Sequence, residues 1–357
     1  MMIHLLEPLS TVFRDWLADH QYPGFRAGQV RKWLFENRAG DFTEMTDLPK
    51  RLREELAAEF RIFTTQVVKH SQASDGTEKL LLELADRQRT ECVLLRDGSR
   101  RSICISSQVG CAMGCVFCAS GLDGVVRNLT SGEIVEQMLQ LQRLLPREER
   151  LSHLVVMGLG EPLANLDRLL PALDEASRPD GLGISARRIT ISTVGLPSGI
   201  DRLTEMATHY QLAVSLHAPN DELRNQLVPV NQKIGLQPIL AAADRYFEAS
   251  GRRLTFEYVL LAGINDQPQH ARQLAALLHG RTAFLNVIPY NPVLELSYRT
   301  PSPSAQKRFR QVLEHAGINV QFRERKGDAI SAACGQLRRS TPARGAEKEE
   351  HLGEGPD

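Results

Sequence analysis

The chain has 357 residues, and its 43 basic and 43 acidic side chains give a formal net charge of zero. Because an excess of positive charge is what draws a whole protein to nucleic acid, this balance leaves only a local patch as an RNA-binding surface. Six cysteines are too few, in a chain of this length, for the disulfide framework of a small secreted protein, and no apolar run approaches the ~20 residues of a membrane helix.

The first 65 residues carry helical periodicity. The chain starts without the basic region and the apolar run of a signal peptide, so we expect a cytoplasmic protein that does not associate with membranes. Apolar residues then recur at helical spacing, which predicts a small helical domain over residues 1–65. The recurring residues are Phe13, Trp16, Leu17, Val30, Trp33, Leu34, Leu48, Leu52, Leu56 and Phe60.

Residues 66–98 predict a β-hairpin that links the helical domain to the rest of the chain. Segments of strand type lie near residues 67–69 and 80–84, and the turn sequence Ser74-Asp75-Gly76 stands between them. We expect this hairpin to brace the following domain.

Residues 99–339 alternate short apolar runs with segments of helical length, which predicts an α/β domain. The expected strands lie at 102–106, 153–157, 188–192, 212–216, 255–261, 284–288 and 319–322, and 131–145 and 239–249 are examples of the expected helices. Parallel strands need such crossovers, which build either a doubly wound sheet or a barrel. Residues 340–357 lack apolar periodicity, and we expect a disordered tail there.

Three cysteines lie within eight residues, at Cys111, Cys115 and Cys118. This spacing can bring soft thiolates to three irons of a 4Fe-4S cluster and leave the fourth iron open. A structural zinc site is the alternative, but it normally closes four ligands and brings two C-x-x-C pairs, and only one such pair exists here. The motif resembles that of the radical S-adenosylmethionine (SAM) enzymes, in which the open iron binds SAM.

Polar residues and a glycine stand where several expected strands end. They are Gly160, Glu161, Ser192, Ser215, Leu216 with its neighbour His217, and Asn291. Barrel enzymes place their chemistry at the carboxyl ends of strands, so these positions are candidates for a binding site. Taken singly, a buried Ser or His is more often a core polar group with satisfied hydrogen bonds. Their recurrence at successive strand ends favours a common site.

Four separated motifs resemble the RlmN/Cfr family of radical-SAM rRNA adenosine methyltransferases, over about residues 10 to 338. They are residues 103–111, 157–163, 215–221 and 332–337. The resemblance implies a partial (βα)6-type TIM barrel of the radical-SAM class, with a helical amino-terminal domain that grips a structured RNA stem. It also implies that Glu161 accepts the ammonium group of SAM and that the other strand-end residues complete the SAM site.

The resemblance assigns group transfer to two further cysteines. Cys334 would accept a methyl group from a first SAM, and a radical made from a second SAM would remove hydrogen from that methyl before it adds to the adenine. Cys104 would resolve the resulting protein–RNA adduct through a transient disulfide with Cys334, and Glu91 matches a proton acceptor. Two buried structural thiols and an exposed strand glutamate are the alternatives.

Two substrate positions remain open within the family. RlmN-type enzymes methylate carbon 2 of an adenosine in the peptidyl-transferase centre of 23S rRNA and also of a tRNA anticodon-loop adenosine, whereas Cfr-type enzymes methylate carbon 8 and confer antibiotic resistance. Pro162 favours carbon 2, while residues 118–121 and 191–195 depart toward the other type. We predict a monomeric carbon 2 enzyme that takes its electron from a flavodoxin or ferredoxin. A glycyl-radical activase and an iron–sulfur electron carrier are the rivals outside the family.

Overall fold

A computed structural model describes residues 2–7, 12–323 and 326–338, so the tail expected at 340–357 lies outside the described residues. The amino-terminal part is helical, with α1 (Val12–Asp19), α2 (Phe25–Phe35) and α3 (Lys50–Glu59). Two short strands, β1 (Ile3–His4) and β2 (Phe60–Arg61), pair in parallel and close this unit. Its core contains the edge-to-face rings of Trp16 and Phe60, whose centroids are 5.4 Å apart. The expected helical domain is therefore present.

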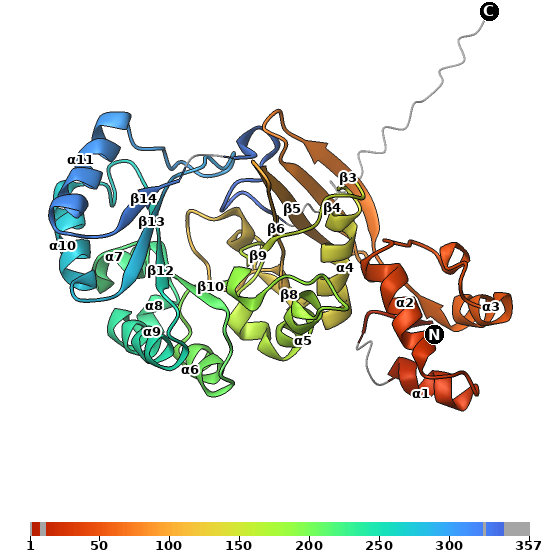
Figure 1. The fold of residues 1–357 in the computed structure, drawn as a ribbon. Coiled ribbons are helices and arrows are strands. Elements are labelled where there is room, and N and C mark those ends of the chain that lie inside the picture. The colour runs from red at the N-terminus through yellow and green to blue at the C-terminus, as the bar shows by residue number, and fades with distance from the viewer. Residues whose placement is uncertain (1, 8–11, 324–325, 339–357) are drawn as a thin grey trace, which may run out of the picture.

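Polar contacts fix the helical unit to the following domain. Arg31 on α2 is buried, and its guanidinium donates to Glu175 at 2.7 Å and to Asp180 at 2.8 Å. His4 lies 3.3 Å from the buried carboxylate of Glu136, measured from Nε2 to Oε2. Figure 1 shows α2 beside α4, with α1 and α3 farther out at this end of the molecule.

In the described part of the chain, ten strands form one sheet in the order β14-β13-β12-β11-β10-β9-β6-β5-β4-β3. Seven of them are parallel neighbours: β6 (Arg100–Cys104), β9 (His153–Val156), β10 (Ile189–Thr193), β11 (Gln211–Ser215), β12 (Leu254–Leu260), β13 (Ala283–Pro289) and β14 (Val320–Phe322). Each expected strand of this region is present. The parallel part is an open barrel of the radical-SAM type, as expected from the resemblance.

Helices cover the outer face of the curved parallel strands (Figure 1). They are α4 (Ser131–Gln142), α5 (Leu166–Ser177), α6 (Pro197–Glu205), α9 (Leu236–Ser250), α10 (Pro268–Leu278) and α11 (Pro303–His315), with the shorter α7 (Asp221–Leu227) and α8 (Asn231–Ile234) between β11 and α9. Within the described residues, no helix is long and apolar enough to cross a membrane.

The remaining strands extend the sheet in antiparallel fashion. The expected hairpin is formed by β3 (Gln66–Gln72) and β4 (Glu78–Glu83), and a third strand, β5 (Arg89–Asp97), joins it to β6. A strand at Glu91 was expected only as an alternative, and no bounds were predicted for β5. Its middle residues are buried on both faces, so its sequence lacks the alternation that identifies a half-exposed strand.

Alternation along the strands decides which residues reach the inside of the barrel. On β6, Ile103 belongs to the main core under the helices, so Cys104 points to the opposite, inner face. On β5, Val93 packs on that inner face with Cys104 and Leu337. Since β4 pairs with β5 so that Leu81 is opposite Glu91, the side chains of Leu81 and Glu91 lie on this same face.

Candidate active site

The cysteine loop (residues 111–118) is held by a small hairpin at the barrel mouth. Strand β7 (Gln108–Gly110) precedes the loop, and it pairs with β8 (Val125–Asn128) beyond the short helix η2 (Ala119–Gly121). The amide of Cys111 donates to the carbonyl of Gly124 at 3.0 Å. Gly110 has φ +78°, and a Cβ there would lie 1.9 Å from the same carbonyl oxygen, so only glycine permits this closure.

The three loop thiols are half-buried, and this burial favours their neutral, protonated form. Desolvation raises the pKa of Cys111 to about 12 and raises the pKa of Cys115 and of Cys118 as well, so each holds its proton at neutral pH. A bound metal replaces such a proton. Among the described residues, no three His, Cys, Asp or Glu side chains converge tightly enough to hold one metal ion. A cubic cluster instead takes one thiolate at each of three separate irons, and three soft thiols on one loop fit that group.

The Gly-Glu-Pro turn after β9 joins two neighbouring strand ends. Gly160 has φ +103°, and a Cβ there would come within 2.6 Å of the Gln108 side chain, so the close approach requires glycine. Glu161 is buried, and its two carboxylate oxygens accept the backbone N–H groups of Leu163 at 3.0 Å and Val194 at 2.8 Å. Burial raises the pKa of this carboxyl group. Glu161 thus has a structural role, because it joins the turn after β9 to the residue that follows β10.

The other expected residues end neighbouring strands at the same edge of the sheet. Ser192 and Ser215 are half-buried near the ends of β10 and β11, and Leu216 is fully buried. His217 follows with φ +59°, and its Nδ1 accepts the N–H of Val259 at 3.1 Å. Burial lowers the pKa of His217 to about 3, so the imidazole is neutral at physiological pH.

Two ring and amide contacts connect these strand ends to the cysteine regions. The His217 ring lies edge-on to Phe117, with centroids 4.9 Å apart, and Phe117 belongs to the cysteine loop. Asn291 donates from Nδ2 to the Cys334 carbonyl at 3.1 Å. Its Oδ1 is buried and has no hydrogen-bond partner among the described residues. Buried acceptors are normally paired, so Oδ1 fits a ligand that brings an N–H donor, as SAM does.

Arg224 is a site residue that the sequence did not reveal. It lies on α7, is fully buried, and donates to the backbone carbonyls of Val194, Ser215 and Leu216 at 2.6, 2.9 and 3.0 Å. Burial lowers its pKa to about 10, so the guanidinium stays charged at neutral pH. It ties the ends of β10 and β11 together. An arginine in a helix is usually solvated, and no signal in the sequence distinguishes a buried arginine such as Arg224 from a solvated one.

The structure brings Cys104 and Cys334 together from distant parts of the chain. Cys104 is buried at the end of β6, and Cys334 lies half-buried in the segment of residues 326–338, called here the Cys334 segment. Cys104 packs in one cluster with Ala332 and Leu337, which lie on either side of Cys334 in that segment. Burial raises the pKa of Cys104 to about 12. Both are free thiols.

The Cys334 segment crosses the barrel mouth and is held on several sides. The amide of Ala119, directly after the cysteine loop, donates to Gly335 O at 2.8 Å, and Ser120 Oγ donates to Leu337 O at 2.7 Å. Gln336 Nε2 donates to the carbonyl of Pro292, beyond β13, at 2.9 Å. These contacts place Cys334 at the carboxyl ends of the strands, beside the cysteine loop.

Glu91 is buried, so the alternative of an exposed strand glutamate is wrong. Its Oε1 lies 2.8 Å from Lys79 Nζ, and its Oε2 accepts the amide N–H of Arg338 at 2.9 Å. Burial raises the pKa of Glu91, and Lys79 opposes that rise. Glu91 borders a cavity of about 330 Å³ between β3, β4 and residues 329–331 of the Cys334 segment.

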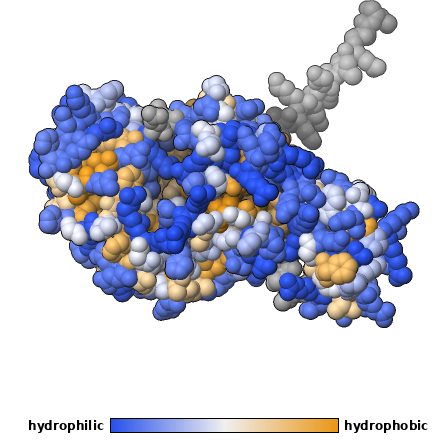
Figure 2. Space-filling view, in the orientation of Figure 1, coloured by the Kyte–Doolittle hydropathy of each residue, from blue (hydrophilic) through white to orange (hydrophobic). Residues whose placement is uncertain are grey.

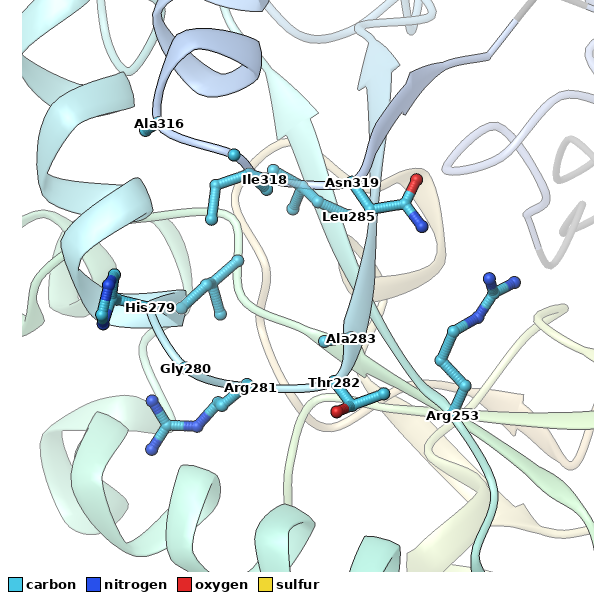
Figure 3. Close-up of a pocket in the computed structure, with 12 residues that line it drawn as sticks. Arg253, His279, Gly280, Arg281, Thr282, Ala283, Leu285, Ala316, Ile318 and Asn319 are labelled. Atoms are coloured by element: carbon cyan, nitrogen blue, oxygen red, sulfur yellow. The ribbon is translucent and has the colours of Figure 1, made fainter.

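A second cavity of about 330 Å³ lies away from this site (Figure 3). Its walls are the start of β13, the segment before β14 and the ends of α10 and α11, with Arg253 and Asn319 at its border. The amino-terminal ends of the strands lie here, at the opposite end of the barrel from the cysteine loop. In barrel enzymes that end contributes to stability, and none of the expected site residues lies there.

We expect Glu161→Gln to have two effects: it should weaken SAM binding, and it should lower the stability of the protein at the strand ends. The new amide nitrogen would face a backbone N–H that now donates to an oxygen, which leaves a donor unpaired and costs about 1 to 3 kcal/mol. If Glu161 binds the SAM ammonium as predicted, loss of charge also removes the charge-assisted part of that bond, so affinity should fall by about ten- to a hundred-fold. Calorimetric titration with SAM and thermal unfolding measure the two effects. Lower stability with unchanged SAM affinity would make the turn purely structural.

Comparisons with known proteins agree with this geometry. The model of the radical SAM superfamily matches residues 105–275, and that of the ribosomal RNA large subunit methyltransferase N-terminal domain matches residues 3–62. The chain is 66% identical, over 337 residues, to the probable dual-specificity RNA methyltransferase RlmN of Rhodopirellula baltica, covering 94% of this chain and 91% of that protein. Identity to the corresponding protein of Symbiobacterium thermophilum is 49% over 327 residues, covering 91% of this chain and 88% of that protein.

A solved structure is similar over nearly the whole fold. It is the crystal structure of a radical SAM methyltransferase from Sphaerobacter thermophilus, which is 42% identical and superposes with a TM-score of 0.91. The match covers 94% of this chain and 99% of that one.

Proposed function

Because the chain belongs to the RlmN family of radical-SAM RNA methyltransferases, we propose that it methylates carbon 2 of an adenosine in the peptidyl-transferase centre of 23S rRNA. A tRNA anticodon-loop adenosine is the proposed second substrate, in keeping with the dual specificity named for the relatives. Family membership removes the rivals outside the family, a glycyl-radical activase and an electron carrier. The observation that carries the proposal is the packing of Cys104 against residues that flank Cys334, together with the hydrogen bond that holds the Cys334 segment beside the cysteine loop.

The cofactors follow from the donor groups present. Cys111, Cys115 and Cys118 would hold a 4Fe-4S cluster, and SAM would lie over the strand ends. When bound there, these groups supply a carbon radical that can remove hydrogen from a methyl group. The proposed SAM contacts are Gly160, Glu161, Ser192, Ser215, Leu216, His217 and Asn291. The unpaired Oδ1 of Asn291 supports this assignment.

Three side chains of the protein would handle the methyl group and the protons. Burial raises the pKa of Cys334, so its thiol must lose a proton before the sulfur can take a methyl group from SAM. Once the methylene carbon links the Cys334 sulfur to the base, Cys104 would form a disulfide with that sulfur, which breaks the carbon–sulfur bond and releases the methylated base. Glu91 would accept the proton that leaves the target carbon. Its carboxylate touches the Cys334 segment through the amide of Arg338.

The RNA would present its adenosine to the barrel mouth. RNA is read mainly at unstacked bases, so the target base should be turned out of its helix. We propose that the helical domain holds a neighbouring stem. It exposes Phe25, with the Arg26 guanidinium 4.8 Å from the ring centroid, and such groups can stack on bases. Figure 2 shows isolated hydrophobic groups on this otherwise hydrophilic part of the surface. The proposed enzyme is a cytoplasmic monomer reduced by a flavodoxin or ferredoxin.

Methylation of carbon 8 is the second candidate, because residues 118–121 and 191–195 depart toward the Cfr type. Residues 119 and 120 form hydrogen bonds to the Cys334 segment, so they can influence how the target base is oriented toward Cys334. Pro162 favours carbon 2.

Nucleoside mass spectrometry tests the proposal. Reconstituted protein is incubated with unmethylated 23S rRNA or tRNA, SAM and a reductant under anaerobic conditions, and the RNA is digested to nucleosides. We expect 2-methyladenosine from both RNAs, and none from a Cys334→Ala control. A product that coelutes with 8-methyladenosine would replace the carbon 2 assignment by the second candidate.

A further inference from the structure

Lys79 is a partly buried lysine on the inner face of the sheet extension. Its side chain is 12% exposed, and Lys79 pairs with Val93, which packs against Cys104 and Leu337. Burial of an ammonium group is unfavourable unless it is paired and hydrogen-bonded. The mechanism proposed above does not use this residue, although it stands at the border of the site.

Two contacts satisfy the Lys79 ammonium group. Nζ lies 2.8 Å from Glu91 Oε1 and donates to the carbonyl of Ser331 at 3.0 Å. The other carboxylate oxygen of Glu91 accepts the amide of Arg338 at 2.9 Å. Ser331 and Arg338 lie on either side of Cys334 in the Cys334 segment. The Lys79–Glu91 pair therefore contacts the segment before and after the cysteine.

Among the described residues, Lys79 is the one whose charged side chain forms an ion pair with Glu91. Burial raises the pKa of Glu91, and the charge and hydrogen bond of Lys79 are the largest opposing effects, followed by the Arg338 amide and the more distant Lys69 on β3. The guanidinium of Arg338 points elsewhere, to Asp123 at 3.1 Å and to Glu295. Without Lys79, a buried Glu91 would bind a proton over a wider pH range and could not accept another.

We propose that Lys79 is a positioning residue, whose ammonium group holds the Glu91 carboxylate ionised and in place beside the Cys334 segment. The inference rests on the proposed function, in which Glu91 accepts the proton from the target carbon. Lys79 itself touches neither the base nor SAM. Its effect should therefore appear in the pH dependence of the RNA step and not in methylation of Cys334.

The test is the pH profile of single-turnover RNA methylation by Lys79→Met. Loss of the positive charge raises the pKa of Glu91, so less of it is ionised at a given pH, and the acidic limb of the profile should move to higher pH. The rate at pH 7 should fall about ten-fold or more, and it should recover as the pH is raised. Peptide mass spectrometry of the purified protein should still find the methyl group on Cys334.

Matched variants separate this role from simple stabilisation. Lys69→Met removes a neighbouring lysine of the same cavity whose charge acts on Glu91 more weakly than that of Lys79, so it should move the acidic limb much less. Lys79→Gln keeps a hydrogen-bond donor but removes the charge, so this variant can be used if Lys79→Met does not fold. Its pH profile should show the same displacement of the acidic limb. An unchanged limb in a folded Lys79 variant, or an equal displacement in Lys69→Met, would overturn the inference. Failure of the proposed function is distinct, since the wild-type protein would then leave the RNA unmethylated.

Discussion

Cys334→Ala and Cys104→Ala variants should fail at different steps of the reaction. Without the Cys334 sulfur, no methyl group is carried, and neither methylated RNA nor an adduct should form. Without Cys104, Cys334 can still take a methyl group and attack the adenosine, but no thiol resolves the adduct. Cys104→Ala protein should therefore remain covalently joined to RNA on a denaturing gel. After nuclease digestion, a nucleotide mass should remain on the peptide that contains Cys334.

Cys92→Ala is the matched control for both variants. Cys92 is fully buried one strand away from Cys104, but it points outward into the main core under the helices. Its removal should reduce stability through lost packing and leave turnover intact. If Cys104 and Cys334 were only packing thiols, their variants would behave like Cys92→Ala. Normal turnover by either variant, or a folded Cys104→Ala protein that methylates Cys334 and forms no adduct, would refute the paired roles.

Simultaneous replacement of Cys111, Cys115 and Cys118 by alanine should abolish the iron–sulfur cluster and reductive SAM cleavage together. The three thiols are the only protein ligands proposed for the cluster, and a cluster with no thiolate ligands has nothing to hold it. Iron and sulfide analysis, the visible absorbance of anaerobically purified protein, and release of 5′-deoxyadenosine with a reductant measure the loss.

Cys92→Ala again gives the control, since it removes a cysteine outside the loop and should retain full iron content. Thermal unfolding of the triple variant without metal tests whether the loop itself is damaged. The loop is closed by backbone contacts such as Cys111 to Gly124, so the fold should survive the substitutions. Full iron content in the triple variant would show that the cluster assignment is wrong.

Local signals in the sequence were enough to predict the parallel strands and the cysteine loop. Each apolar run between residues 102 and 322 became a parallel strand, because a strand buried on both faces needs a continuous apolar run and a crossover. The positions of Gly160 and His217 at strand ends also follow from where those runs stop. Strand β5 was not predicted with its own bounds. Because both of its faces are buried, its sequence does not alternate between apolar and polar residues, and charged residues at its ends shorten its apolar run.

The sequence by itself determined the spacing of Cys111, Cys115 and Cys118 and the positions of the parallel strands along the chain, because both depend on neighbours within a few residues. Only the tertiary structure decided which distant groups meet. Asn291 reaches the Cys334 carbonyl, Arg224 reaches the ends of two strands, and Lys79 reaches Glu91 and Ser331. Each contact joins different elements of the fold, and each of these polar groups needs a partner that no local pattern specifies.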